Sequence, residues 1–166
     1  MSENEQTKIF NDWLKKYKGL LFKIIRSYAF NLNDQDDLFQ EITIQIWNSI
    51  PNFKGDSSAS TWVYRVSLYS AISWSKKEKK HTNGKQPLDG ISHMLTEISS
   101  FKDSRVEWLY KQISKLNEID RSLTLLLLDG FSYKEMSNIL GISESNVGVK
   151  INRIKKNLIQ KSEEVF

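Results

Sequence analysis

The stretch SYKEMSNILGISESNVGVKINRIKK, Ser132 to Lys156, contains two apolar runs with helical spacing, separated by a glycine. Ser132 and Glu135 have the spacing of a capping box, which predicts a helix start. Gly141 tolerates the left-handed backbone conformation that ends a helix and turns the chain sharply. Ser143 is then a candidate N-cap for the next helix. The stretch therefore predicts a helix–turn–helix.

The second predicted helix has two distinct faces. Its apolar residues are expected to pack inward, and they are Val147, Ile151, Ile154 and Leu158. A polar stripe runs beside them and consists of Asn146, Lys150, Arg153 and Asn157. A helix–turn–helix places the N-terminal part of its second helix nearest the bases of the major groove, which favours Ser145, Asn146 and Lys150 as readers. Lys155 and Lys156 are better placed for phosphates. The alternative is a packed helical pair whose cationic stripe is merely solvated.

The remaining sequence predicts an all-α protein. Its 166 residues include only two prolines and seven glycines, and its apolar residues recur mostly at helical spacing. Further helices are expected at about 8–29, from Asn33 to Ile50, and at 61–77. Charge, Asn-Gly and proline occur together after residue 77, which is typical of a linker. We therefore expect two small helical domains, at 8–80 and 106–163, joined by a linker at 81–105 in which Ile91, Met94, Leu95 and Ile98 allow a short helix.

Composition limits the classes of function. The chain has no cysteine, which excludes disulfides and thiolate metal sites. Its mean hydropathy of -0.48 and the lack of a long uncharged apolar run argue against membrane insertion, and its start does not resemble an export signal. We therefore expect a cytoplasmic protein. The net charge of +4 suggests an anionic partner. No cofactor is expected, because the acidic residues Asp34, Asp36 and Asp37 suit a helix start better than a metal site.

The motifs of both halves resemble one family. LNEIDRSLTLLLLDGFSYKEMSNILGISESNVGVKINRIKKNL resembles region four of bacterial sigma factors of the extracytoplasmic-function (ECF) type, within the sigma-70 family. DDLFQEITIQIW, FKGDSSASTWVYRV and KKEKK resemble region two of the same family, in the same order. The resemblance implies a promoter-specificity subunit that binds core RNA polymerase and promoter DNA. Many relatives are held inactive by an anti-sigma factor, but no residue in this sequence identifies one.

The resemblance implies a polymerase-docking motif on the second helix. In the family this helix docks on the polymerase largest subunit, and the matching residues are Asp37, Leu38, Gln40 and Glu41. Helical spacing adds Ile44 and places Asp37, Gln40, Glu41 and Ile44 on a face other than the expected core stripe of Leu38, Ile42 and Ile46. The alternative is a solvated acidic helix start.

The loop from Phe53 to Ser60 corresponds to the family's segment that grips the melted minus-ten strand. Its small and polar residues can approach bases and phosphates, and the candidates are Lys54, Gly55, Asp56, Ser57, Ser58 and Ser60. Arg65 on the following helix is a candidate backbone contact, along with Lys76, Lys77, Lys79 and Lys80. Tyr69 is a further candidate minus-ten contact, but many relatives have asparagine there, so the family's base preference does not transfer to it. Trp62 can stack on bases but better fits the core.

The predicted minus-thirty-five contacts belong to the helix–turn–helix: Ser143, Ser145, Asn146, Lys150, Arg153 and Lys155. Relatives often have lysine and a small polar residue where this chain has Gly148 and Val149. Asn117 replaces a frequent proline at a helix entry. These departures place more of the expected contact on Asn146, Lys150 and Arg153.

Two other classes of function remain alternatives. A helix–turn–helix regulator that acts without polymerase needs neither the docking motif nor the serine loop. A DNA-processing enzyme such as a recombinase is a weaker alternative, because His81 and His93 lie in the expected linker and no nucleophile is paired with a base. The sequence therefore favours a non-catalytic sigma subunit.

Overall fold

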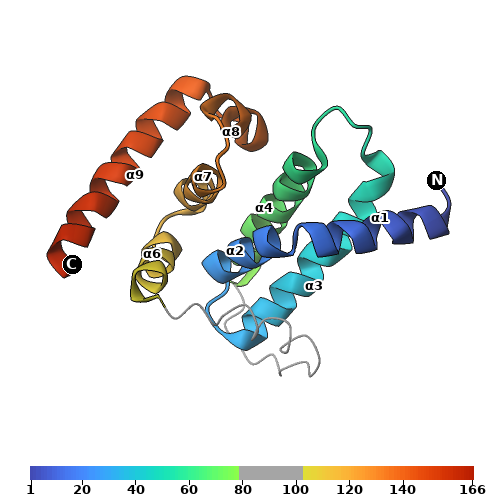
Figure 1. Cartoon of the computed structure of the whole chain (residues 1–166), viewed down its shortest axis with the longest axis horizontal. Helices are drawn as coiled ribbons and strands as arrows, with labels where there is room; N and C mark the ends of the chain where they lie inside the picture. The colour runs from blue at the N-terminus through green and yellow to red at the C-terminus, as the bar shows by residue number, and fades with distance from the viewer. Residues whose placement is uncertain (79–102) are drawn as a thin grey trace. The chain divides into compact units, whose positions relative to one another are not determined.

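The computed structural model describes residues 1–78 and 103–166, which are helical without any strand (Figure 1). The chain divides into two compact units, Met1–Lys102 and Asp103–Phe166. The predicted all-α class and its two helical domains are confirmed. The short helix expected around Ile91 lies outside the described residues.

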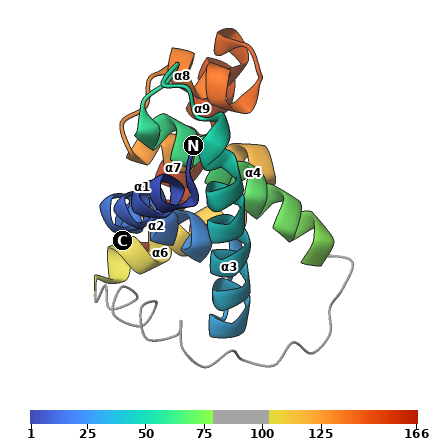
Figure 2. The same ribbon diagram turned by 90° about the vertical axis from the view of Figure 1, so that its right-hand side faces the viewer.

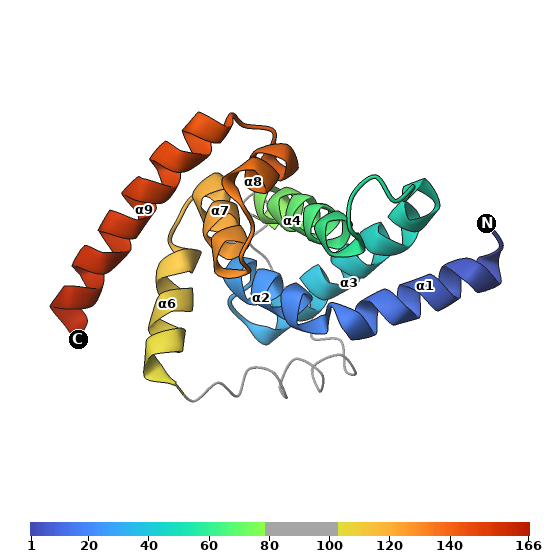
Figure 3. The ribbon, with the colours of Figure 1, turned by 45° about the horizontal axis from the view of Figure 1, so that its top comes forward.

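The N-terminal segment forms two helices, not the single helix predicted from about residue 8 to 29. Helix α1 spans Glu3–Lys16 and helix α2 spans Lys18–Tyr28, and Figure 3 shows them following one another with a break between them. The break lies at Tyr17, whose φ of -105° and ψ of 19° depart from helical values. The nearby Gly19 is a weak helix former, so this turn is easily interrupted. The helix also starts earlier than expected, because Ser2 and Glu5 form a capping box.

The next two helices agree closely with the sequence patterns. Helix α3 spans Leu32–Ser49, and Asn31 caps it by accepting a hydrogen bond from the Asp34 amide at 2.8 Å. The cap therefore lies slightly before Asn33, where the helix was expected to start. A 3-10 turn, η1 (Ile50–Asn52), contains Pro51 and ends the helix. Helix α4 then spans Ala59–Glu78.

The core of the first unit lies between α2, α3 and α4. The predicted stripe of Leu38, Ile42 and Ile46 is buried, and α3 packs against α4, which it crosses in the view of Figure 2. The fully buried side chains from the other helices include Leu21, Ile24, Ile25, Tyr64 and Leu68. This packing holds α3 against α4, and residues of both helices line the groove described below.

The second unit contains four helices. They are α6 (Ser104–Ser114), α7 (Glu118–Leu128), α8 (Tyr133–Leu140) and α9 (Glu144–Val165). Gly130, at φ 83°, ends α7, and the Phe131 amide donates to the Leu126 carbonyl at 3.1 Å. Glycine readily adopts this left-handed conformation, so Gly130 forms the C-terminal end of the helix. Helix α6 starts slightly before residue 106, within the last residues of the expected linker.

Candidate nucleic-acid interface

Helices α8 and α9 form the predicted helix–turn–helix. Ser132 caps α8 by accepting a hydrogen bond from the Glu135 amide at 3.1 Å. Gly141 ends α8 with a φ of 70°, in the left-handed region. Ser143 caps α9 by accepting from the Asn146 amide at 3.1 Å. The turn is therefore fixed by local bonds that the sequence specifies residue by residue.

The first turns of α9 present polar side chains to solvent. Ser145 and Asn146 are exposed and Lys150 is partly exposed, while Val147, Ile151 and Ile154 are buried against the rest of the unit. Lys155 is exposed further along the helix. Ser143 uses its hydroxyl as the helix cap. The arrangement offers amide, hydroxyl and ammonium donors over one end of a helix, as groove reading requires.

Tyr133 lies over Gly148, a contact that the sequence analysis did not predict. A Cβ added to Gly148 would lie 3.6 Å from the Tyr133 ring, which is ordinary van der Waals contact. Val149 beside it is 65% exposed. An alanine at position 148 would therefore also fit against the Tyr133 ring, and no periodic pattern in the sequence signals this contact.

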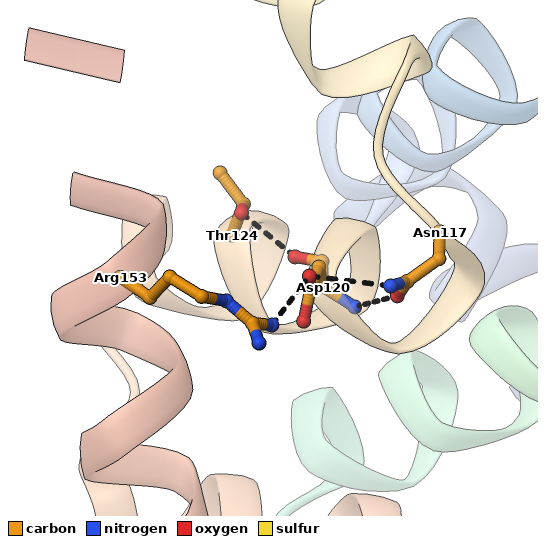
Figure 4. A network of polar contacts seen from close by, with 4 residues as sticks. All are labelled: Asn117, Asp120, Thr124 and Arg153. Atoms are coloured by element: carbon orange, nitrogen blue, oxygen red, sulfur yellow. Dashed lines mark hydrogen bonds and ion pairs between the residues drawn. The ribbon is translucent and has the colours of Figure 1, made fainter. Parts of the chain in front are cut away.

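Arg153 binds Asp120 of α7. Its Nη2 donates to Asp120 Oδ2 at 2.9 Å, as Figure 4 shows. Asn117, the N-cap of α7, donates to the same oxygen at 3.3 Å. Arg153 was predicted to contact DNA, but in the free chain its guanidinium ties α9 to α7.

The serine loop of the first unit precedes α4. Gly55 has a φ of 79°, and Lys54, Gly55 and Asp56 are exposed. Ser58 accepts a hydrogen bond from the Thr61 amide at 3.2 Å and lies 3.1 Å from the Ser60 hydroxyl. The Ser58 hydroxyl therefore caps the start of α4, and Ser57 and Ser60 are half-buried.

A groove of about 600 Å³ lies between α3 and α4. Arg65 and Tyr69, both predicted to contact the minus-ten strand, line it together with Glu41 of the predicted docking motif. Tyr69 is 47% exposed at this groove. The other lining residues are Gln45, Asn48, Ser49, Asn52, Val66, Ser70, Ser73 and Lys77. The fold thus brings two predicted sites next to each other, which the separate sequence motifs did not indicate.

The docking motif on α3 divides between surface and core. Ile44 is 53% exposed, and Gln40 and Glu41 are partly exposed. Leu38 is fully buried, so its side chain supports the helix from inside and does not itself offer a surface. Asp37 accepts a hydrogen bond from the Trp74 indole at 3.3 Å, which joins α3 to α4.

The acidic cluster at the start of α3 does not form one group. Only Asp34 lies in the first turn, while Asp36 is buried. Burial raises the pKa of the Asp36 carboxyl above its ordinary value. In residues 1–78 and 103–166, no cluster of three or more His, Cys, Asp or Glu side chains is arranged to hold a metal ion. The same part of the chain has no helix with the length and apolar character needed to span a membrane.

Comparison with known families matches both units. The sequence model of Sigma-70 region 2 matches residues 13–81, and that of Sigma-70, region 4, matches residues 106–158. Together these matches cover most of the chain. A regulator that acts without polymerase would account only for the second match, so the comparison does not favour that alternative.

Curated relatives are similar over nearly their whole length. The chain is 25% identical to RNA polymerase sigma factor YlaC of Bacillus subtilis (strain 168), covering 92% of this chain and 94% of that protein. It is 26% identical to the ECF RNA polymerase sigma-E factor of Escherichia coli (strain K12), covering 90% and 84% respectively.

Two solved structures have a similar fold. Sigma factor RpoE, in complex with the anti-sigma factor NepR from Bartonella quintana, superposes with a TM-score of 0.71, at 18% identity, covering 95% of this chain and 98% of RpoE. CnrH, in complex with the cytosolic domain of CnrY, gives a TM-score of 0.68 at 18% identity, covering 96% and 91%. With both regions present in order on one helical chain, this protein belongs to the sigma-70 family as an ECF-type sigma factor, a subunit that directs RNA polymerase in transcription initiation.

Proposed function

We propose that the two units divide promoter recognition, and that the chain itself performs no covalent chemistry. In this proposal residues 8–80 hold core polymerase and the melted minus-ten strand, residues 106–163 read minus-thirty-five duplex, and residues 81–105 connect them. The observation that carries the proposal is the presence of both family regions, in order, on one chain. Reading two elements through one tether raises overall affinity through effective concentration.

The start of α9 is the proposed duplex reader. Ser145, Asn146 and Lys150 supply the donors and acceptors at its N-terminal turns, and Ser143 fixes where that helix starts. Asparagine can form two hydrogen bonds with adenine on its major-groove edge, accepting from N6 and donating to N7, and lysine can donate to O6 and N7 of guanine. Lys155 is the proposed phosphate contact, since phosphate contacts set orientation more than sequence preference.

The groove between α3 and α4 and the serine loop form the proposed minus-ten surface. Arg65 and Tyr69 line the groove, and the serine loop, which is exposed at Lys54 to Asp56 and at Ser58, leads into the same helix α4. An aromatic side chain that stacks on an unstacked base contributes about 1–3 kcal/mol. Tyr69, exposed at the groove, is the residue best placed for such stacking in the first unit.

The outer face of α3 is the proposed docking surface for core polymerase. Gln40, Glu41 and Ile44 are accessible on it, and Ile44 is the large apolar side chain that such a contact would bury. Asp37 and Leu38 support this face, through Trp74 and through the core respectively. Apolar anchors surrounded by polar groups are the usual centre of a protein interface.

Regulation by an anti-sigma factor and action in the cytoplasm complete the proposal. Both structural neighbours were solved with a partner, NepR for RpoE and the cytosolic domain of CnrY for CnrH. A chain with the same fold offers a related surface, and core polymerase is itself cytoplasmic.

Reconstitution tests the function directly. The purified chain, added to bacterial core polymerase, is expected to start transcription at a defined subset of promoters, and start-site mapping on genomic DNA would identify them. Specific binding of the free chain to duplex DNA, without any association with core polymerase, would instead support the regulator.

A further inference from the structure

The Asp120 carboxylate is buried at the start of α7 and depends on side chains from two helices. Its Oδ2 accepts hydrogen bonds from Arg153 at 2.9 Å and from Asn117 at 3.3 Å (Figure 4). Its Oδ1 is also buried and has no hydrogen-bond partner within the described residues. A buried carboxylate is tolerated when a positive group compensates it, and Arg153 supplies the full opposite charge.

The two ends of this ion pair differ in freedom. The Asp120 side chain is 9% exposed, whereas that of Arg153 is 60% exposed. Asp120 is also fixed through its backbone, since its amide donates to Asn117 Oδ1 at 2.9 Å and its carbonyl accepts from Thr124 Oγ1 at 2.7 Å. Asp120 is thus held in place on α7, and the Arg153 side chain extends from α9 to bind it.

The other contacts that hold α9 are mainly apolar. Val147, Ile151 and Ile154 bury one side of the helix. Apolar burial has little directional preference, so it permits small rotations and shifts of a helix along its axis. A charge-assisted hydrogen bond has a fixed length and direction. The Arg153 bond therefore supplies orientation that the apolar contacts lack.

We propose that Arg153 is a positioning residue, which acts through Asp120 to set the rotation and register of α9 and hence the placement of Ser145, Asn146 and Lys150 on promoter DNA. The proposal deepens the assignment of α9 as the duplex reader and rests on that assignment. It gives Arg153 a different role from the direct contact with minus-thirty-five DNA that the sequence predicted.

The two roles predict opposite effects of changing Asp120. If Arg153 contacts DNA directly, Asp120 competes with DNA for the guanidinium, and Asp120→Ala strengthens binding. If Arg153 positions α9, Asp120→Ala weakens binding, because the anchor is lost. The salt dependence of binding separates the roles again, since each lost phosphate contact lowers the slope of log affinity against log salt by about 0.9.

The test uses holoenzyme, reconstituted from core polymerase and the full chain. A minus-thirty-five element is first selected with wild-type holoenzyme from promoters randomised at that element. Affinity for the selected promoter is then measured over a range of salt for Arg153→Ala, Asp120→Ala, the double variant and Arg153→Lys. We expect each alanine variant to lose about tenfold in affinity, the double variant to lose no more than the larger single loss, and Arg153→Lys to retain most of the binding. We also expect an unchanged salt slope and reduced discrimination among minus-thirty-five sequences.

Lys155→Ala is the control for a phosphate contact. For this variant we expect a shallower slope of log affinity against log salt and an unchanged preference among minus-thirty-five sequences. Asp120→Asn, which keeps the shape of the side chain, replaces Asp120→Ala if thermal unfolding shows that the alanine variant does not fold. The proposal is overturned if Arg153→Ala lowers the salt slope as Lys155→Ala does, if loss of Asp120 strengthens binding, or if the two losses add. If wild-type holoenzyme initiates transcription but selects no minus-thirty-five element, the assignment of α9 as the duplex reader fails. This result differs from one in which wild-type holoenzyme selects an element and only the predicted effects of the Arg153 and Asp120 variants are absent.

Discussion

Trp62 donates a hydrogen bond from its indole Nε1 to Ser49 Oγ over 3.1 Å, and thereby joins the start of α4 to the end of α3. The two residues flank the serine loop. The Trp62 ring also packs on Phe53, with ring centroids 5.5 Å apart, and Phe53 packs on Trp13 at 5.2 Å. Trp62 therefore packs against Phe53 of the loop, but its side chain is only half-buried, so the predicted core role is met only in part.

Replacing Trp62 with alanine is expected to lower the free energy of unfolding of the first unit by about 2–3 kcal/mol, because a half-buried aromatic surface is lost. Trp62→Phe keeps the ring contact and loses the hydrogen bond, at a cost of about 1 kcal/mol. Urea unfolding measures both. Tyr69→Ala is the comparison, a more exposed aromatic on the same helix, and should reduce stability less than Trp62→Ala does. Equal losses for Trp62 and Tyr69 would contradict the assigned role.

Gly141→Ala is expected to destabilise the second unit by about 1–2 kcal/mol, because a side chain disfavours the left-handed backbone that ends α8. Gly19 provides the comparison. It lies within α2, and an added Cβ meets nothing within 4 Å, as is also true at Gly141. Gly19→Ala should therefore stabilise the first unit by up to about 1 kcal/mol. Thermal unfolding of both variants measures the change in stability. Opposite signs for the two variants would show that backbone conformation, and not steric crowding, determines the effect of the added methyl group.

Local signals were the part of the fold that sequence predicted well. Ser132, Gly141 and Ser143 act on residues within one turn of themselves and start or end the helices as predicted, although of the predicted capping box only the bond to the Ser132 side chain forms. The buried stripe of Leu38, Ile42 and Ile46 likewise follows from helical periodicity alone. The break at Tyr17 was missed because the apolar stripe continues through it, and only the backbone shows the interruption.

Contacts between distant residues were not predictable from these patterns. Arg153 and Asp120 lie 33 residues apart, and nothing in the helical pattern of α9 distinguishes an arginine that binds α7 from one that faces solvent. The groove between α3 and α4 likewise depends on which faces of two helices meet. Periodicity identifies the buried side of a helix, whereas the partner of each polar side chain depends on tertiary packing.

Asp36→Asn is expected to stabilise the first unit by about 1 kcal/mol at neutral pH, because the buried carboxylate Oδ1 has no hydrogen-bond partner among the described residues. Burial raises the pKa of Asp36 in the folded state above the ordinary value of 3.8. The folded chain therefore binds this proton more tightly than the unfolded chain does, and the carboxylate reduces stability as pH rises from 3.8 through the raised pKa.

The difference in stability between Asp36→Asn and the wild type should consequently vanish below the ordinary pKa and be complete above the raised one. Urea unfolding between pH 3 and 8 measures it, with the exposed Asp12→Asn as the control. A difference that grows on acidification would show that a favourable partner, and not burial, controls Asp36.

Ile44→Ala is expected to weaken association with core polymerase by about tenfold while leaving stability nearly unchanged, because the side chain is 53% exposed and is the proposed apolar anchor. Gln40→Ala and Glu41→Ala should cause smaller losses of the same kind. Leu32→Ala is a matched control, since Leu32 lies on the same helix and is 50% exposed. Competition with a labelled sigma factor for core polymerase measures these affinities. If Ile44→Ala and Leu32→Ala reduce the affinity for core polymerase equally, the proposed docking face is wrong.

Lys150 and Lys155 lie on the same helix, yet their substitution is expected to have different consequences for promoter binding. Lys150, near the start of α9, is the proposed base reader, so Lys150→Ala should reduce discrimination at one or two minus-thirty-five positions by about 1–3 kcal/mol. Lys155 is the proposed phosphate contact, so Lys155→Ala should weaken binding to all sequences alike and lower the slope of log affinity against log salt by about 0.9. Holoenzyme binding to promoters with single minus-thirty-five substitutions, measured at several salt concentrations, separates the two effects. If Lys150→Ala leaves the ranking of these promoters unchanged, Lys150 is not a base reader, and Ser145 and Asn146 must supply the sequence preference.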